Sequence, residues 1–135
     1  MGRTVRKVAK LKSMKVSDGF RAFVVDQLAG VPQVLSRAMF GGVGLYSRDV
    51  FFGLLARDLL YLKTDDSNRG DYEAAGMPAF RPYADKAMTM PYYEVPVAVL
   101  ENPPELAAWA KRSIAVAKRT AAARRAAVRR TQKGP

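Results

Sequence analysis

The spacing of apolar residues near the start of the chain predicts a helix over residues 18–29. Ser17 and Asp18 stand at its start, and short polar side chains of this kind accept hydrogen bonds from the first free backbone amides of a helix. Gly30 and Pro32 end it, because glycine permits a left-handed cap and proline lacks an amide donor. One face of this helix is apolar and consists of Phe20, Phe23, Val24 and Leu28.

Four short apolar stretches follow and predict strands that pair in sequence order. Only two or three turn residues separate each stretch from the next, whereas parallel strands need connections of about a dozen residues or more. The sequence therefore predicts an antiparallel meander. Between residues 50 and 63 apolar residues occupy both alternating positions, which predicts that at least one strand is covered on both faces. The four stretches are 34–40, 43–46, 50–56 and 59–63.

The next part of the chain predicts a short helix and two weaker strands. Residues 65–68, Asp-Asp-Ser-Asn, combine a turn with a helix N-cap and predict a helix over 67–75 that ends at Gly76. Strand-like stretches over 80–83 and 87–94 come next. Their prolines confine them to the edge or the ends of a sheet, because proline cannot donate to a strand ladder.

The last predicted element is a helix that begins after Asn102. Asn102 caps it, the two prolines that follow fit its first turn, and Glu105 is placed to close a capping box. Past about Lys118 the sequence is rich in Ala and Arg, which favour a helix but have little to bury, so we expect a solvated helical extension or a disordered tail. The apolar stripe that precedes it consists of Leu106, Trp109, Ala110, Ile114 and Ala117.

Three closely spaced glycines, Gly41, Gly42 and Gly44, raise the question of a phosphate cradle. Such a cradle needs glycines between a strand and the start of a helix, whose N-terminus then meets the phosphate. Here the residues that follow are strand-like. We therefore predict that Gly41 and Gly42 supply the positive φ angles or the bulge of a tight strand connection. Gly44 and Gly53, inside strands, are expected to leave space for neighbouring side chains.

The composition excludes several kinds of chemistry. The chain has 135 residues, which predicts a single domain. It contains no cysteine and no histidine, so it lacks disulfides, thiolate zinc sites, thiol nucleophiles and the commonest general base. No apolar run reaches the roughly 18 to 20 residues that a membrane helix needs. We expect a cytoplasmic protein without a membrane partner.

The net charge of +11 is concentrated at the two ends of the chain. Residues 1–15 carry six basic residues and residues 111–135 carry nine, with no acidic residue in either segment, whereas residues 16–110 have a net charge of −4. Basic ends of this kind bind nucleic acid without sequence preference, or serve only as solvated tails that aid solubility. The candidate nucleic-acid contacts are Arg3, Arg6, Lys7, Lys10, Arg119, Arg124, Arg125, Arg129 and Arg130.

Carboxylates are the remaining candidates for catalysis or metal binding. The densest cluster is Asp65 and Asp66, with Asp71 and Glu73 nearby, and its oxygens would suit a hard cation such as magnesium. The start of a helix favours the same residues without any ligand, and we prefer that interpretation. Lys63 is expected to form a surface ion pair with the neighbouring aspartates. We predict no enzyme activity, no catalytic residue, no metal and no cofactor.

The aromatic residues have two interpretations. They could form a platform on which nucleic-acid bases stack, or they could pack in the core and across strands, which is the commoner use of aromatic residues in strands. We prefer packing. The residues concerned are Phe40, Tyr46, Phe51, Phe52, Tyr61, Tyr92, Tyr93 and Trp109.

Five segments of the chain, in order, resemble the N-terminal domain of the TfoX/Sxy competence-regulator family. They are RAMFGGVGLY, FFGLLARDLLYLKTDD, YEAAGMPAFRPY, MTMPYYEVP and LENPPELAAWAKRSIAVA, and the resemblance covers about residues 15–118. It implies a two-layer α+β fold, with a five-stranded antiparallel sheet and helices at the start, between strands three and four, and at the C-terminus. The signature residues, expected to be structural, are Met39, Phe40, Gly41, Gly42, Gly44, Tyr46, Tyr61, Lys63, Tyr92, Tyr93, Pro96 and Trp109.

The resemblance also implies a regulatory role. Full-length members of the family regulate genes of natural transformation, as coactivators working with the cAMP receptor protein, and they have a second, C-terminal domain. We expect this chain to consist of a basic flexible arm (1–15), a TfoX N-terminal-like domain (16–118) and a basic Ala/Arg tail (119–135).

We expect this domain to act by protein–protein contacts in transcriptional regulation, as a monomer or homodimer. By resemblance, its partner is the transcription machinery or a regulator such as the cAMP receptor protein. The alternative is a non-specific nucleic-acid-binding protein that acts through its basic tails on DNA.

Overall fold

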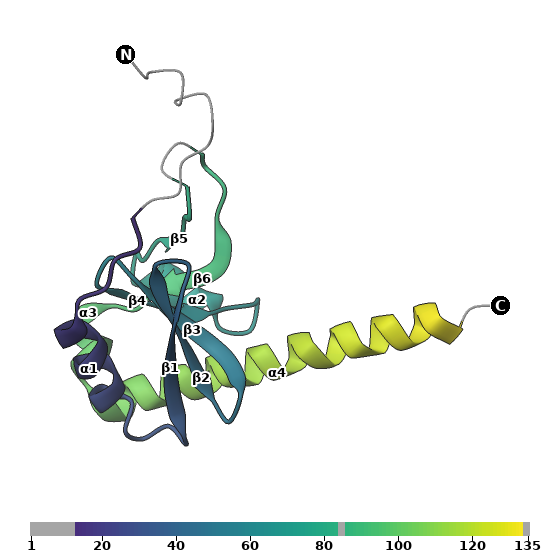
Figure 1. Ribbon diagram of the computed structural model, residues 1–135, viewed down its shortest axis with the longest axis horizontal. Helices are drawn as coiled ribbons and strands as arrows, with labels where there is room; N and C mark the ends of the chain where they lie inside the picture. Colours follow the sequence, from purple (N-terminus) through teal and green to yellow (C-terminus); the bar gives the residue numbers. More distant parts are fainter. Residues whose placement is uncertain (1–12, 84–85, 134–135) are drawn as a thin grey trace, which may run out of the picture.

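The computed structural model of the protein describes residues 13–83 and 86–133. Figure 1 shows a sheet with helices packed against it, and a long C-terminal helix that projects far beyond the rest of the molecule. The helices are α1 (Asp18–Gln27), α2 (Arg69–Ala74), α3 (Val97–Leu100) and α4 (Pro103–Lys133). The strands are β1 (Val34–Met39), β2 (Gly42–Ser47), β3 (Val50–Ala56), β4 (Leu59–Lys63), β5 (Ala79–Phe80) and β6 (Met90–Glu94).

The strands form one antiparallel sheet in the order β1-β2-β3-β4-β6-β5. The predicted α+β class is confirmed, but the sheet has six strands where the resemblance implied five. The middle helix, α2, consequently follows the fourth strand and not the third. Both edge strands are easy to miss in the sequence, because β1 is only partly buried and β5 is two residues long.

Two-residue turns join the first four strands, and all six turn residues have positive φ angles. The turns are Phe40–Gly41, Arg48–Asp49 and Arg57–Asp58. This backbone conformation matches the right-handed twist of paired antiparallel strands, which is why such short connections suffice. Gly41, with φ of 82°, supplies a positive φ as predicted.

Gly42 and Gly44 lie inside β2, where a side chain would not fit. A Cβ atom on Gly42 would lie 2.6 Å from the carbonyl oxygen of Leu55, so Gly42 permits a close backbone approach and not the turn itself. A Cβ atom on Gly44 would lie 2.5 Å from Sδ of Met39, which confirms that Gly44 leaves space for a neighbouring side chain. A strand follows Gly41 directly, so the glycines do not stand at a helix N-terminus and form no cradle of that kind.

The main core lies on one face of the sheet, where the helices cover it. Leu45, Phe52 and Leu62 are fully buried there. From the helices, the same cluster includes Val24, Leu28, Tyr72, Leu106 and Ala110. The rings of Tyr72 in α2 and Trp109 in α4 pack edge to face with their centroids 4.8 Å apart, which joins the short helix to the long one.

A bulge in β3 distributes its large side chains between the two faces of the sheet. The pairing with β2 shifts between Leu45, opposite Gly53, and Tyr46, opposite Phe51, which leaves Phe52 without a partner. Phe52 therefore points into the main core, whereas Phe51 packs against the residues of the opposite face. The prediction of a strand covered on both faces is thus confirmed only in part, because both faces of β3 carry apolar clusters but the described helices contribute to one of them.

Hydrogen bonds to the last residue of β4 hold α4 against the sheet. The carbonyl of Lys63 accepts a bond of 2.8 Å from the hydroxyl of Ser113 in α4 and one of 3.1 Å from Nδ2 of Asn68. Asn68 occupies the N-cap position of α2, but its side chain makes no capping bond. Within the predicted segment 65–68, Oδ1 of Asp65 accepts from the amide of Ser67 at 2.8 Å. At the start of α4 the cap is confirmed, since Oδ1 of Asn102 accepts from the amide of Glu105 at 3.2 Å.

Several predicted helices and strands are longer than those in the structure. The first helix ends at Gln27, although its predicted cap is confirmed, because the Ser17 hydroxyl accepts from the amide of Phe20 at 3.1 Å. Helix α2 is shorter than the predicted 67–75, and the last two strands are shorter than the predicted 80–83 and 87–94. Pro82 fits the early end of β5, since it cannot donate to the ladder, whereas Pro91 lies inside β6. The single turn of α3 was not predicted.

Replacing glycine by alanine should lower the stability of the folded protein at Gly42 and raise it at Gly19. At Gly42 the new methyl group meets a backbone carbonyl at 2.6 Å, so we expect Gly42→Ala to lower the free energy of unfolding by about 2 kcal/mol. Gly19 lies in the first turn of α1 with nothing within 4 Å, so Gly19→Ala should raise that free energy by about 0.5 kcal/mol. Urea unfolding of both variants measures this, and equal effects would contradict it.

Asp65 should make stability depend on pH in the acid range. Hydrogen bonds from Ser67, and a bond and ion pair with Arg119 of α4 at 3.1 Å, lower the pKa of Asp65 to about 2. In the unfolded chain the pKa is about 4. The stabilisation is therefore complete above pH about 4 and is lost as the pH falls towards 2. The difference in unfolding free energy between the wild type and Asp65→Asn should shrink over that range, and a constant difference would contradict this.

Candidate functional site

The face of the sheet opposite the helices carries a second apolar cluster, to which none of the helices among the described residues contributes. Its buried members, Ala56, Tyr61, Phe80 and Tyr92, come from four different strands. Met14, from the segment that precedes α1, packs against them together with side chains of β3 and β4. This face is therefore covered mainly by strand side chains and by one short segment of chain, and part of it stays accessible.

An open apolar groove of about 340 Å³ lies on this face, between the hairpin of β1 and β2 and the segment around β5. Its lining includes Met14, Met39, Phe40, Phe80 and Met90. Methionine side chains are flexible and polarisable, and they are common on surfaces that adapt to a partner. The groove has the size and the chemistry to receive a few apolar side chains of another molecule.

Phe40 stands at the rim of this groove in an unfavourable conformation. Its side chain is 86% exposed and its φ angle is 49°. A left-handed conformation costs a non-glycine residue roughly 1–2 kcal/mol, and burial of this ring within the chain does not offset that cost. Strained, exposed residues of this kind are typical of binding sites.

Basic residues adjoin the groove. Arg57 donates to the Tyr61 hydroxyl at 3.2 Å, while its Nη1 is buried without a hydrogen-bond partner among the described residues. Arg81 adjoins Phe80 in the chain, and Lys86 places its ammonium 5.5 Å from the ring centroid of Tyr83, another lining residue. The groove is thus apolar at its base and positively charged along part of its border.

A row of aromatic rings crosses the same face. The centroids of Tyr46 and Phe51 lie 5.2 Å apart, and those of Phe51 and Tyr92 lie 5.9 Å apart. Arg37 lies over the Tyr46 ring at one end and Lys63 over the Tyr92 ring at the other, at 5.3 and 5.0 Å. Tyr92 is only 6% exposed. The rings therefore pack against each other, which favours the packing interpretation over a platform for stacked bases.

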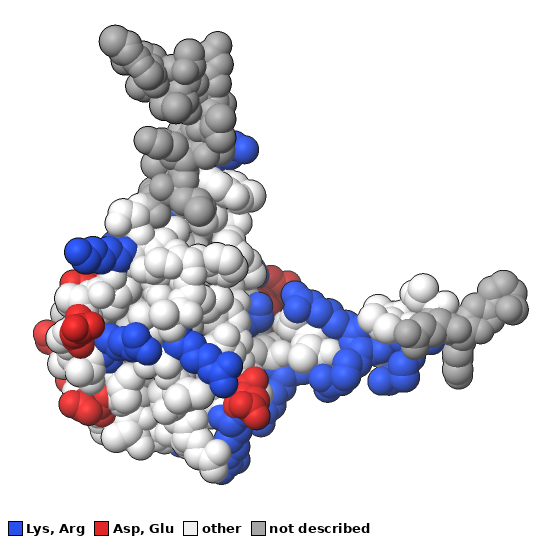
Figure 2. Space-filling model, viewed as in Figure 1, with Lys and Arg blue, Asp and Glu red and all other residues white. Residues whose placement is uncertain are grey.

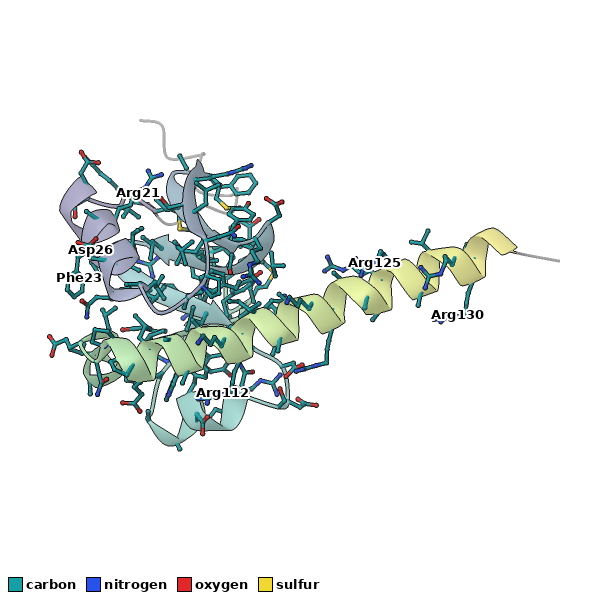
Figure 3. The ribbon with its side chains drawn as sticks, turned by 90° about the horizontal axis from the view of Figure 1, so that it is seen from below. Arg21, Phe23, Asp26, Arg112, Arg125 and Arg130 are labelled. Atoms are coloured by element: carbon teal, nitrogen blue, oxygen red, sulfur yellow. The ribbon has the colours of Figure 1, made fainter. Side chains whose placement is uncertain are left out.

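The C-terminal part of α4 is a second candidate surface. Figure 2 shows basic side chains along the helix that projects from the body, while acidic residues lie on the body itself. Figure 3 shows Arg125 and Arg130 on this projecting part, in contrast to Arg112, which lies beside the body. At about 1.5 Å per residue, the helix beyond residue 117 is roughly 24 Å long.

The predicted nucleic-acid contacts divide into two groups. Arg3, Arg6, Lys7 and Lys10 lie outside the described residues. Arg119 is paired with Asp65 at the base of the projecting helix. Further along α4, in exposed positions, lie Arg124, Arg125, Arg129 and Arg130.

The acidic cluster of the sequence is divided among local contacts. Asp65 binds Ser67 and Arg119, Asp66 pairs with Arg69 at 2.6 Å, and Asp71 pairs with Arg112 at 3.4 Å. Within residues 13–83 and 86–133, no three acidic side chains gather into a group that could hold a metal ion. The ion pair expected at Lys63 is not among the described ones, because its ammonium lies over Tyr92 and the aspartates have other partners.

The sequence alone does not predict the groove. It predicts a flexible arm that includes Met14 and a short turn that includes Arg57. The signal that was available is the Met-rich composition around the predicted strands, at Met39, Met88 and Met90. Which of these side chains share a face depends on strand register, so their spacing alone does not predict a groove.

The signature residues are distributed between the two faces. Tyr93 and Trp109 both pack against Tyr72 on the covered face, at 5.8 and 4.8 Å. Pro96 occupies the N-cap position of α3. On the uncovered face or at its rim lie Met39, Phe40, Tyr46, Tyr61, Lys63 and Tyr92.

Comparison with known families gives one result over most of the chain. The family model described as the TfoX N-terminal domain matches residues 26–117. Comparison with curated protein sequences found no match. In the described part of the chain, no helix combines the length and the apolar character that crossing a membrane requires.

Proposed function

Because this chain belongs to the TfoX N-terminal domain family, we propose that it is a small module of transcriptional regulation that binds a protein partner on the uncovered face of its sheet. The observation that supports this most directly is the apolar groove with Phe40 at its rim. An 86% exposed ring in a left-handed turn lowers stability without contributing to the core. A binding role accounts for such a residue.

The chemistry of the groove defines the partner. Its base takes apolar side chains, and its basic border favours acidic residues on either side of them. We take Arg57, which follows the lining residue Ala56 in the chain and whose Nη1 has no hydrogen-bond partner among the described residues, as the candidate contact for one such carboxylate. The partner is thus an acidic protein segment with a few apolar anchors. The proposal places it on the transcription machinery or on a regulator such as the cAMP receptor protein.

Phe40→Asn should separate binding from stability. Asparagine tolerates the left-handed conformation, and Asn-Gly is a preferred pair in two-residue hairpin turns, so the variant should be more stable than the wild type by about 1 kcal/mol. It removes the exposed ring at the same time, so partner binding should fall by about tenfold or more, as for an aromatic anchor of an interface. Thermal unfolding and titration calorimetry with purified candidate partners measure the two effects.

Cross-linking from position 40 identifies the protein that binds the groove. A photo-reactive phenylalanine analogue at position 40 should cross-link to the cAMP receptor protein or to RNA polymerase. The matched control is position 23, a 41% exposed phenylalanine on α1, far from the groove lining. Equal cross-linking from both positions, or wild-type affinity in Phe40→Asn, would rule out docking on this face.

The projecting helix supports a second candidate function, non-specific binding of nucleic acid. Beyond residue 117 the chain has seven basic residues and no acidic one. Part of this charge has a structural benefit, since cations near a helix C-terminus interact favourably with the helix dipole. That benefit is limited to about the last turn, and it does not account for Lys118, Arg124 and Arg125 further back in the helix.

Salt dependence tests this second function. If the projecting helix contacts phosphates, Arg129→Gln with Arg130→Gln should weaken duplex DNA binding and reduce the slope of log affinity against log salt by up to about 1.8. The control is Lys111→Gln with Arg112→Gln, an equal change in charge on the part of α4 that packs on the body. Equal effects of the two pairs would indicate only a dependence on net charge. No binding at low salt would exclude the function.

A further inference from the structure

A second hollow, of about 650 Å³, lies where α4 leaves the sheet, at the start of β3, and its lining shares Phe51 and Tyr92 with the lining of the Phe40 groove. The start of β3, the end of β4 and Tyr92 of β6 form its wall on the sheet side. On the α4 side the lining includes Ala117, Ala121 and Ala122, whose small side chains leave the space open.

The hollow is lined by four basic residues. Lys63 comes from the sheet, and Lys118, Arg124 and Arg125 come from α4, while Asp49 is the acidic residue in the lining. None of these four cations takes part in an ion pair with an acid in the described parts of the chain, although Asp49 belongs to the same lining. Asp65, which acts on the charge of Lys63, is bound by Ser67 and Arg119.

Lys63 is held rigidly at this position. Its carbonyl accepts from Ser113, which is fully buried, and from Asn68, which is 3% exposed. Its backbone pairs with Tyr92, and the next residue, Thr64, donates to the carbonyl of Pro91 at 2.9 Å. The ammonium lies 5.0 Å from the Tyr92 ring centroid. These hydrogen bonds fix the backbone of Lys63, and the contact with the Tyr92 ring keeps the ammonium on the sheet side of the hollow.

The positive charge at the hollow is only partly compensated. Partial burial of Lys63 and the nearby charge of Arg124 both lower the pKa of the Lys63 ammonium, while Asp65 acts in the opposite direction with a smaller effect. Two cations that disfavour each other's charge are the arrangement that an anion between them would relieve. The helix dipole does not explain it, because Lys63 lies in the sheet and Arg124 lies more than two turns before the end of α4.

We propose that this hollow is a phosphate-binding site in which Lys63 and Arg124 are the charged contacts. Phosphate is the ligand that suits an ammonium and a guanidinium that line one hollow, since the guanidinium binds two of its oxygens and the ammonium binds as a point charge. The site is independent of protein docking at the Phe40 groove. The phosphate can belong to a nucleic-acid backbone or to a free phosphorylated compound, and the experiment distinguishes these sources.

Lysine NMR tests the site on the intact chain. The ¹³Cε signal of Lys63 is titrated with pH in the presence of sodium pyrophosphate and, separately, of sodium chloride at equal ionic strength. Bound pyrophosphate favours the charged ammonium, so the pKa of Lys63 should rise in pyrophosphate relative to chloride. Lys111, on the part of α4 beside the body, should show no such difference. The same shift at Lys63 and Lys111, or none at Lys63, would overturn the proposal.

Variants of the lining residues test pyrophosphate binding at the hollow independently of NMR. Pyrophosphate should raise the thermal unfolding temperature of the wild type at constant ionic strength, because it binds only the folded chain. The shift should be lost in Lys63→Gln and in Arg124→Gln, and kept in Lys111→Gln. An equal shift in all four proteins would mean that no site exists at the hollow.

Oligonucleotides identify the source of the phosphate. If a short oligonucleotide perturbs the Lys63 signal and pyrophosphate displaces it, the site takes nucleic-acid phosphates. If only pyrophosphate perturbs that signal, the site takes a free phosphorylated compound. The site can exist when DNA binding by Arg129 and Arg130 fails, and DNA can bind those residues when Lys63 does not respond, so the two hypotheses fail separately.

Discussion

The position of α4 on the sheet depends on the burial of its apolar stripe and on one hydrogen bond, from the Ser113 hydroxyl to the carbonyl of Lys63. Ser113 contributes a fully buried hydroxyl to this bond, and a buried hydroxyl without a partner would cost about 1–3 kcal/mol. The helix therefore crosses β4 at a defined point, and Asn68 ties the loop before α2 to the same carbonyl. This contact helps to determine where the helix leaves the sheet. The position of the hollow, between the alanines of α4 and the ends of β3 and β4, and the direction of the basic part of α4 follow from that point.

The two faces of the sheet have different roles because the helices all pack on one of them. On that face, large side chains such as Phe52 and Tyr72 are fully buried and serve stability. On the other face a few strand residues and Met14 form a smaller cluster, and the groove stays open beside it. The β3 bulge connects the two, because it turns Phe52 inward and leaves Phe51 on the outer face. Phe40 then stands at the rim of an accessible apolar surface, where its exposed ring and left-handed backbone favour binding over stability.

The charged residues are also divided between two parts of the molecule, the folded body and the projecting end of α4. The net charge of +11 does not make the folded body basic, since residues 16–110 have a net charge of −4. Beyond Ala117, where the apolar stripe of α4 ends, the charged residues of the helix are all basic, so the helix changes from a core element to an exposed basic surface within a turn or two. Arg119 is at the transition and still pairs with Asp65, whereas Arg124 has no acid within an ion-pair distance among the described residues. This transition gives the protein two candidate surfaces of different chemistry, one apolar with a basic border and one basic throughout.

Local sequence patterns were sufficient to predict the class of fold, the caps at Ser17 and Asn102, the hairpin glycine and the absence of histidine and cysteine chemistry. These features depend on neighbours within a few residues, so their physical causes are present in the chain itself. The edge strand β1 was predicted closely, but the predictions for β5 and β6 were too long, because pairing across the sheet sets their extent. The α3 turn and the actual hydrogen-bond partners of Asn68 were not predicted. Only the tertiary structure decided that Lys63 faces Arg124, which is 61 positions further along the chain, and that Met14, Phe40 and Met90 share one groove. The physical reason is that strand register and helix crossing determine which side chains meet, and both are set by packing across the whole fold.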